Sequence, residues 1–172
     1  MNKVAGFVGF ECSLVNKANQ LHTGWFLNSD LSTDYYAIIG LSATVSDDIQ
    51  LSSSSQISAA DVLWVKKQDV VDYVQSFEGN YGKITLQQIS ADASELRMHA
   101  DTGYRDVFGN RTLDADGKAR HKYPHRKYWL TYSTKMKEKP VNLVIPRDTL
   151  EKLPHTIHFI VTKSGIKRIE GK

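Results

Sequence analysis

Alternation of apolar and polar residues is the feature that most constrains this chain. Apolar or small residues occupy every even position from Val4 to Leu14, whereas Glu11 and Ser13 occupy odd positions. The same period of two recurs on the odd positions from Tyr35 to Val45. Because successive side chains of a strand point to opposite faces of a sheet, this pattern predicts strands that each bury one face.

Further strands are predicted along the rest of the chain. Shorter alternating or apolar runs occur at 21–28, 61–66, 128–133, 141–145, 157–161 and 166–170. Residues 83–89 and 94–100 are strand-like and are joined by the polar segment 90–93, so a hairpin is predicted there. Strands that lie this close in sequence favour antiparallel pairing.

One helix is predicted, over residues 67–77. Its apolar residues follow the spacing of a helix face, at positions 70, 71, 74 and 77. Asp69 would lie in the first turn, where the helix dipole favours an acid. We therefore predict a mostly β fold, with α+β as the alternative. The predicted architecture is a single domain over residues 1–172, an antiparallel sandwich or bent sheet of about eight or nine strands with this helix packed on it.

Composition narrows the class of protein. The 172 residues are 41% hydrophobic and 10% aromatic, which is enough for a core and excludes disorder throughout. No apolar run approaches the roughly 18 residues of a membrane-spanning helix, and no signal-peptide pattern is present. The single cysteine, Cys12, excludes an internal disulfide and is predicted to be buried and inert. We therefore expect a cytoplasmic protein with no membrane partner.

Charge is distributed unevenly along the chain. Residues 1–100 hold 6 Lys and Arg against 11 Asp and Glu, whereas residues 101–172 hold 16 against 8. The stretch 118–139 is the most basic, with eight cations and the single acid Glu138. Such a stretch attracts phosphate or an acidic surface. The alternative is that the basic half neutralises the acidic half within one fold.

Aromatic residues are interleaved with the cations between Arg120 and Tyr132. Cations neutralise the phosphates of nucleic acid, and each aromatic ring that stacks on a base contributes about 1–3 kcal/mol. This combination predicts a binding surface for nucleic acid or another polyanion. The predicted binding residues are Lys118, Arg120, Lys122, Arg126, Lys127, Trp129, Lys135 and Lys137.

The aromatic residues of this region also have an ordinary structural explanation. Tyr128, Leu130 and Tyr132 alternate as core residues of a strand do, with the cations as a solvated flank. Large indole side chains usually anchor a core, which is the prediction for all three tryptophans: Trp25, Trp64 and Trp129. A partly exposed tryptophan would instead mark a recognition surface.

A second group of residues combines imidazoles with carboxylates. Such groups together hold a divalent metal or supply a catalytic base. Pro124, however, breaks the helical spacing between His121 and His125, and no metal-ligand signature is matched, so no metal or cofactor is predicted. Solvated histidines in a basic loop are the alternative. The residues of this group are His99, Asp101, Asp106, His121 and His125, of which all but Asp106 are kept as candidate catalytic residues.

Three functions are consistent with these features. The first is a non-catalytic module that binds nucleic acid or another polyanion through residues 118–139. The second is a protein-interaction or self-assembling module, a homo-oligomer whose acidic and basic halves are complementary. The third is a small metal-dependent hydrolase or nuclease. Catalysis needs several groups held together, and no spacing here indicates that, so a protein without enzyme activity is favoured.

Overall fold

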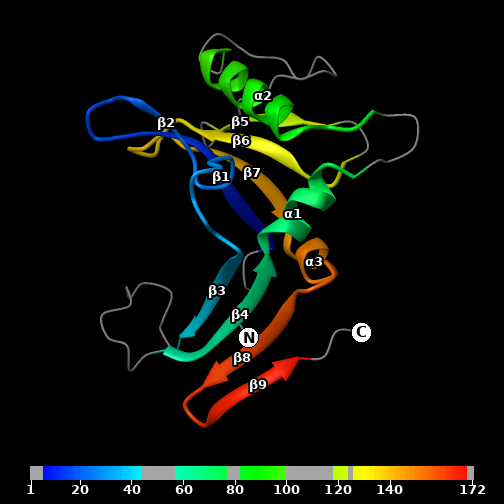
Figure 1. Ribbon diagram of the computed structural model, residues 1–172. Coiled ribbons are helices and arrows are strands. Elements are labelled where there is room, and N and C mark those ends of the chain that lie inside the picture. Colours follow the sequence, from blue (N-terminus) through cyan, green and yellow to red (C-terminus); the bar gives the residue numbers. More distant parts are fainter. Residues whose placement is uncertain (1–5, 44–56, 77–81, 100–117, 124–125, 170–172) are drawn as a thin grey trace. The chain divides into compact units, whose positions relative to one another are not determined.

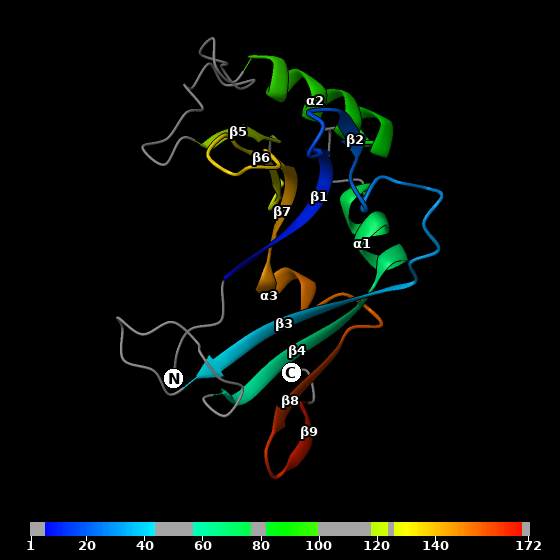
Figure 2. The same cartoon turned by 90° about the vertical axis from the view of Figure 1, so that its left-hand side faces the viewer.

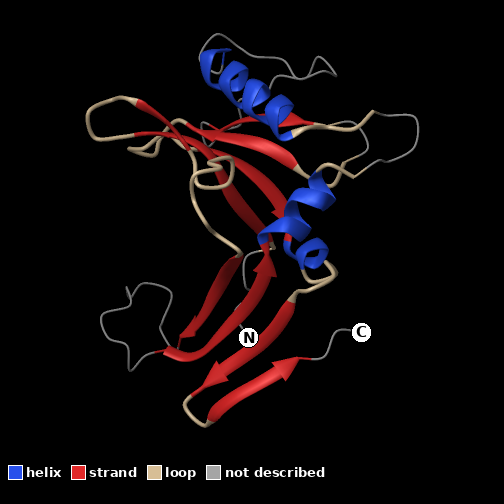
Figure 3. Cartoon of the chain, in the orientation of Figure 1, coloured by secondary structure: helices blue, strands red, loops and turns tan. Residues whose placement is uncertain are grey.

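The computed structural model describes residues 6–43, 57–76, 82–99, 118–123 and 126–169. Within these ranges the chain forms nine strands and three helices (Figure 3). The strands make two antiparallel sheets, one of five strands and one of four. The mostly β, antiparallel fold predicted from the period-two pattern is therefore confirmed.

The chain divides into two compact units, each built around one sheet. The four-stranded unit comprises Met1–Val8, Thr33–Val70 and Arg147–Lys172, and the five-stranded unit comprises Gly9–Ser32 and Val71–Pro146. The single domain expected from chain length stays a prediction.

The five-stranded sheet has the strand order β2-β1-β7-β6-β5 (Figure 1). Antiparallel register places His121 of β5 opposite Leu130 of β6, and Leu130 opposite Leu143 of β7. Residues directly opposite one another share a face, so these three side chains lie on one side of the sheet. The strands are β1 (Phe7–Val15), β2 (Leu21–Thr23), β5 (Lys118–Lys122), β6 (Trp129–Ser133) and β7 (Val141–Pro146).

Helix α2 (Leu86–His99) covers that face, where it contacts β5 and β6 (Figure 1). Ile89 and Leu96 of the helix are fully buried, as are Leu130 and Leu143 of the sheet. Each fully buried side chain of this size contributes about 1.5–3 kcal/mol of hydrophobic free energy. The core of the five-stranded unit therefore lies between α2 and the sheet.

The hairpin predicted for residues 83–100 is wrong, because residues 86–99 of this stretch form α2. The alternation of Leu96, Met98 and Ala100 suggested a strand. The buried residues of α2 instead follow the spacing of a helix face: Ile89, Asp92, Ala93 and Leu96. Thr85 marks the start of the helix: its Oγ1 accepts a hydrogen bond from the Gln88 backbone N–H at 3.1 Å. A threonine followed three residues later by glutamine is the sequence signature of a helix N-terminus, and this signal outweighs the short alternating run.

The four-stranded sheet has the order β3-β4-β8-β9, and its last two strands form a terminal hairpin (Figure 2). Helix α1 (Lys67–Val74) follows β4 without a break, which confirms a helix near the predicted range 67–77. It ends at Val74, and residue 77 lies outside the described residues. Helix α3 (Arg147–Leu150) makes one turn before β8. The strands are β3 (Tyr35–Ala43), β4 (Ile57–Lys66), β8 (Ile157–Thr162) and β9 (Gly165–Ile169).

Candidate functional site

Strands β5 and β6 place cations and an indole on the sheet face away from α2. His121 lies on the α2 side, since its Nε2 is 3.7 Å from a carboxylate oxygen of Asp92 in α2. The neighbouring Lys122 therefore points to the other side, and it is exposed. Lys122 is directly opposite Trp129 in the antiparallel register. The Lys122 side chain and the Trp129 indole therefore lie on this second face.

A cleft of about 600 Å³ lies where β5 ends and β6 begins. The described residues that line it include four cations and three aromatic side chains, and no carboxylate. The cleft, called the basic cleft below, is lined by Arg120, Lys122, Tyr123, Arg126, Lys127, Tyr128, Trp129 and Pro146. Its volume falls within the range of about 300–1,000 Å³ that is typical of small-ligand sites.

Two tyrosines form a rigid wall of the basic cleft. The Tyr123 hydroxyl donates a hydrogen bond to Asp92 Oδ2 at 2.9 Å, and the Tyr128 hydroxyl donates one to the Val74 carbonyl at 2.7 Å. Both residues are buried, and their ring centroids are 5.3 Å apart. Because both hydroxyls have buried partners, the rings are held in one orientation.

Asp92 organises the buried polar groups behind this wall. Its Oδ1 accepts a hydrogen bond from Gln88 Nε2 at 2.7 Å, while its Oδ2 accepts the one from Tyr123. Burial, together with the nearby Asp92 charge, raises the pKa of Tyr123, so its phenol stays protonated and acts as a donor. Asp92 was missed by sequence reasoning, which placed it in the turn of the wrong hairpin.

Arg126 is fixed by the segments that surround the cleft. Its Nη1 donates to the Ser76 carbonyl at 2.8 Å, and its Nη2 donates to the Gly82 carbonyl at 3.4 Å. Both acceptors are neutral backbone groups. The guanidinium is therefore held at the cleft without a carboxylate taking part in these two bonds.

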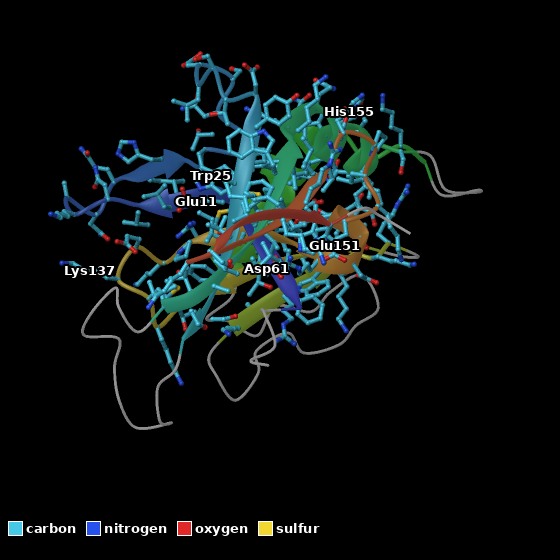
Figure 4. The ribbon with its side chains drawn as sticks, turned by 90° about the horizontal axis from the view of Figure 1, so that it is seen from below. Glu11, Trp25, Asp61, Lys137, Glu151 and His155 are labelled. Carbon is cyan, nitrogen blue, oxygen red and sulfur yellow. The ribbon has the colours of Figure 1, made fainter. Side chains whose placement is uncertain are left out.

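The structure brings together five of the eight predicted binding residues. These five line the basic cleft: Arg120, Lys122, Arg126, Lys127 and Trp129. Lys118 lies at the opposite end of β5, where it is opposite Ser133. Lys135 and Lys137 are exposed in the turn between β6 and β7, beyond that end of the strand pair. Figure 4 labels Lys137. The predicted cations therefore lie at both ends of the strand pair β5–β6 and do not form one group.

The candidate catalytic residues are only partly described. His121 is 6% exposed, so the interpretation of it as a solvated loop histidine is wrong. His99 is exposed in the last turn of α2, and Asp101, Asp106 and His125 lie outside the described residues. Among the residues that the structure describes, no group of three or more His, Cys, Asp or Glu is arranged to hold a metal ion.

Titration of buried groups leads to a prediction: the protein loses stability at alkaline pH. Burial raises the pKa of Cys12 from 9.0 to about 12, in agreement with its predicted burial, and the pKa of Tyr123 is also raised. The unfolded chain releases these protons near the ordinary pKa values, whereas the folded chain retains them. The contribution of these protonated groups to the free energy of unfolding is thus complete below pH about 9. It falls as pH rises, by up to about 1.4 kcal/mol per pH unit for each group.

Urea unfolding between about pH 8 and pH 11 measures this dependence. The variant Tyr123→Phe removes one of these groups, so its free energy of unfolding is expected to fall less steeply above pH about 10. Equal slopes for Tyr123→Phe and the wild-type protein would contradict the role assigned to Tyr123.

Comparisons with protein-family models, curated proteins and solved structures find no match to this chain. No helix in the described ranges has the length and apolar character required to cross a membrane. The function is therefore inferred from the chemistry of the basic cleft itself.

Proposed function

We propose that the protein is a non-catalytic binding module that engages single-stranded nucleic acid through the basic cleft. The observation that carries this proposal is the convergence of four cations and Trp129 on one concave site. No carboxylate stands among the described lining residues, so the site favours a ligand that carries negative charge.

The two kinds of side chain in the cleft match the two parts of a nucleotide. Guanidinium groups bind phosphate oxygens through paired hydrogen bonds, and lysines neutralise phosphate as point charges. The indole of Trp129 offers a face for base stacking, which is worth about 1–3 kcal/mol per base. Stacking needs an unpaired base, and the cleft volume is that of a small-ligand site. Both features favour a single strand over a duplex.

Fluorescence anisotropy with a labelled single-stranded oligonucleotide tests this proposal. Lys122→Glu combined with Lys127→Glu is expected to weaken binding on the order of a hundredfold, because both exposed side chains line the cleft. The magnitude of the slope of log K against log salt concentration is expected to decrease by about 1.4. This decrease corresponds to about 0.7 for each lost phosphate contact.

A matched control distinguishes an effect of the basic cleft on binding from an effect of the net charge of the protein. Lys135→Glu combined with Lys137→Glu makes the same change in charge outside the cleft, and we expect less than about a threefold loss of affinity. Trp129→Ala is expected to weaken oligonucleotide binding by about tenfold or more, and to leave binding of a ring-free polyanion such as inorganic polyphosphate unchanged. Equal losses for the two charge-reversal pairs, or no binding at about 50 mM salt, would overturn the proposal.

A further inference from the structure

One face of the four-stranded sheet is mostly apolar, with apolar residues on all four strands. The register places Ile39 of β3 opposite Val62 of β4, and Val62 opposite Phe159 of β8. Continuing this alternation assigns the remaining members of the face. This apolar face consists of Tyr35, Ala37, Ile39, Leu41, Ala60, Val62, Trp64, Lys66, Ile157, Phe159, Val161, Ile166 and Arg168.

Much of the apolar face is exposed. Ile39 is 59% exposed, Leu41 is 50% exposed and Ile166 is 73% exposed. Trp64, predicted to anchor the core, is instead 40% exposed and stacks on Tyr35 with ring centroids 5.7 Å apart. Monomeric proteins rarely leave a contiguous apolar surface of more than a few hundred Å² in water, so a surface of this kind marks an interaction site.

The composition of the apolar face favours a permanent interface. Lys66 and Arg168 are its only charged members within the described parts of β3, β4, β8 and β9. Transient interfaces are about as polar as the rest of a protein surface, whereas homodimer interfaces are more apolar. The face therefore has the chemistry of an interface between identical subunits.

The size of the face suits the same occupant. The seven residues from Tyr35 to Leu41 have seven register partners on β4, and five residues of β8 and four of β9 continue the pairing. At about 3.4 Å by 4.8 Å per residue, these residues make a footprint of about 380 Å². Protruding side chains make the accessible area larger than this footprint. A standard interface buries about 800 Å² of accessible surface from each partner, so the whole face must take part.

The two ends of the face carry aromatic side chains of different number. Its large aromatic side chains, Tyr35 and Trp64, lie at one end, and the small Ala60 lies on β4 four residues before Trp64. A two-fold axis that runs across the strands would set the aromatic end of one copy against the Ala60 end of the other. Two sheets that pack face to face in this way lie about 10 Å apart, and their large and small side chains interdigitate between them.

We propose that a second copy of this chain packs face to face on the apolar face, giving a two-fold symmetric dimer. Association then rests on apolar burial and not on complementary acidic and basic halves. The two explanations differ in their response to salt, since burial of apolar surface is not screened whereas attraction between exposed charges is.

Sedimentation equilibrium provides the test. We expect twice the chain mass of 19.4 kDa at micromolar protein, unchanged by about 0.5 M NaCl. Ile39→Glu would bury two carboxylates in each dimer and is expected to weaken association on the order of a hundredfold. Ile166→Glu, on the opposite edge strand β9, provides a second variant should Ile39→Glu fail to fold. Met98→Glu on α2 is the matched control, because Met98 is 67% exposed but lies outside the face.

Three results would overturn the proposal. One is a wild-type protein that stays monomeric at about 100 µM, where an interface of standard size associates. The second is a dimer that dissociates in salt, which would assign association to charge. The third is a dimer that neither Ile39→Glu nor Ile166→Glu weakens relative to Met98→Glu, which would place the contact elsewhere.

Discussion

Gly24→Ala is expected to lower the free energy of unfolding by about 3 kcal/mol, at the upper end of the usual cost of overpacking. A Cβ atom at Gly24 would lie 2.6 Å from the Glu11 carbonyl carbon and 2.7 Å from the Cys12 carbonyl carbon. Both neighbours are backbone atoms of β1, so no side-chain rotation relieves the contact. The Gly24 N–H also donates to the Cys12 carbonyl at 2.8 Å. Movement of residue 24 away from β1 would break this hydrogen bond.

Urea unfolding measures this effect against a glycine in open space. A Cβ atom at Gly82 would meet nothing within 4 Å among the described residues, so Gly82→Ala is expected to change stability by less than about 1 kcal/mol. Similar midpoints for Gly24→Ala and Gly82→Ala would show that close backbone approach does not explain the glycine at position 24.

Arg147→Met is expected to cost about 3 kcal/mol, through loss of a largely buried ion pair in the four-stranded unit. The Arg147 guanidinium contacts the Asp61 carboxylate and donates from Nε to Glu151 Oε1 at 2.8 Å (Figure 4 labels both acids). Arg147 is 8% exposed. Removal of one partner of a buried pair usually costs about 3–5 kcal/mol, and the partial exposure of Asp61 places this case at the low end.

Glu151→Gln is the matched control for this pair. Glu151 is more exposed than Asp61, and an exposed pair one helical turn apart contributes about 0.3–0.5 kcal/mol. Arg147→Lys keeps the charge but loses the planar fork that bonds two acids, so we expect an intermediate value. A cost for Arg147→Met no larger than that for Glu151→Gln, by urea unfolding, would contradict the assignment.

Most of the secondary structure could be predicted because it depends on local patterns. The alternation around Tyr35 and the helical spacing from Val70 both recur in the structure, as β3 and α1. Helix α2 was missed because its apolar residues are few and a short alternating run overlaps them. Of the candidate site, the cations were visible as a charged stretch, whereas Asp92, which holds Tyr123 in place, was not.

The sequence by itself determined which side chains share a face within each strand, because the period of two is a property of the extended backbone. It also placed the cations and aromatic residues of 118–139 close together along the chain. Only the tertiary structure decided the neighbours of each strand, such as β1 beside β7 and β4 beside β8. Such pairings join segments far apart in sequence, and they depend on which hydrogen-bonded edges and apolar surfaces fit together. For that reason the grouping of five predicted residues around one cleft, and the exposure of Trp64 on an apolar sheet face, emerged only from the fold.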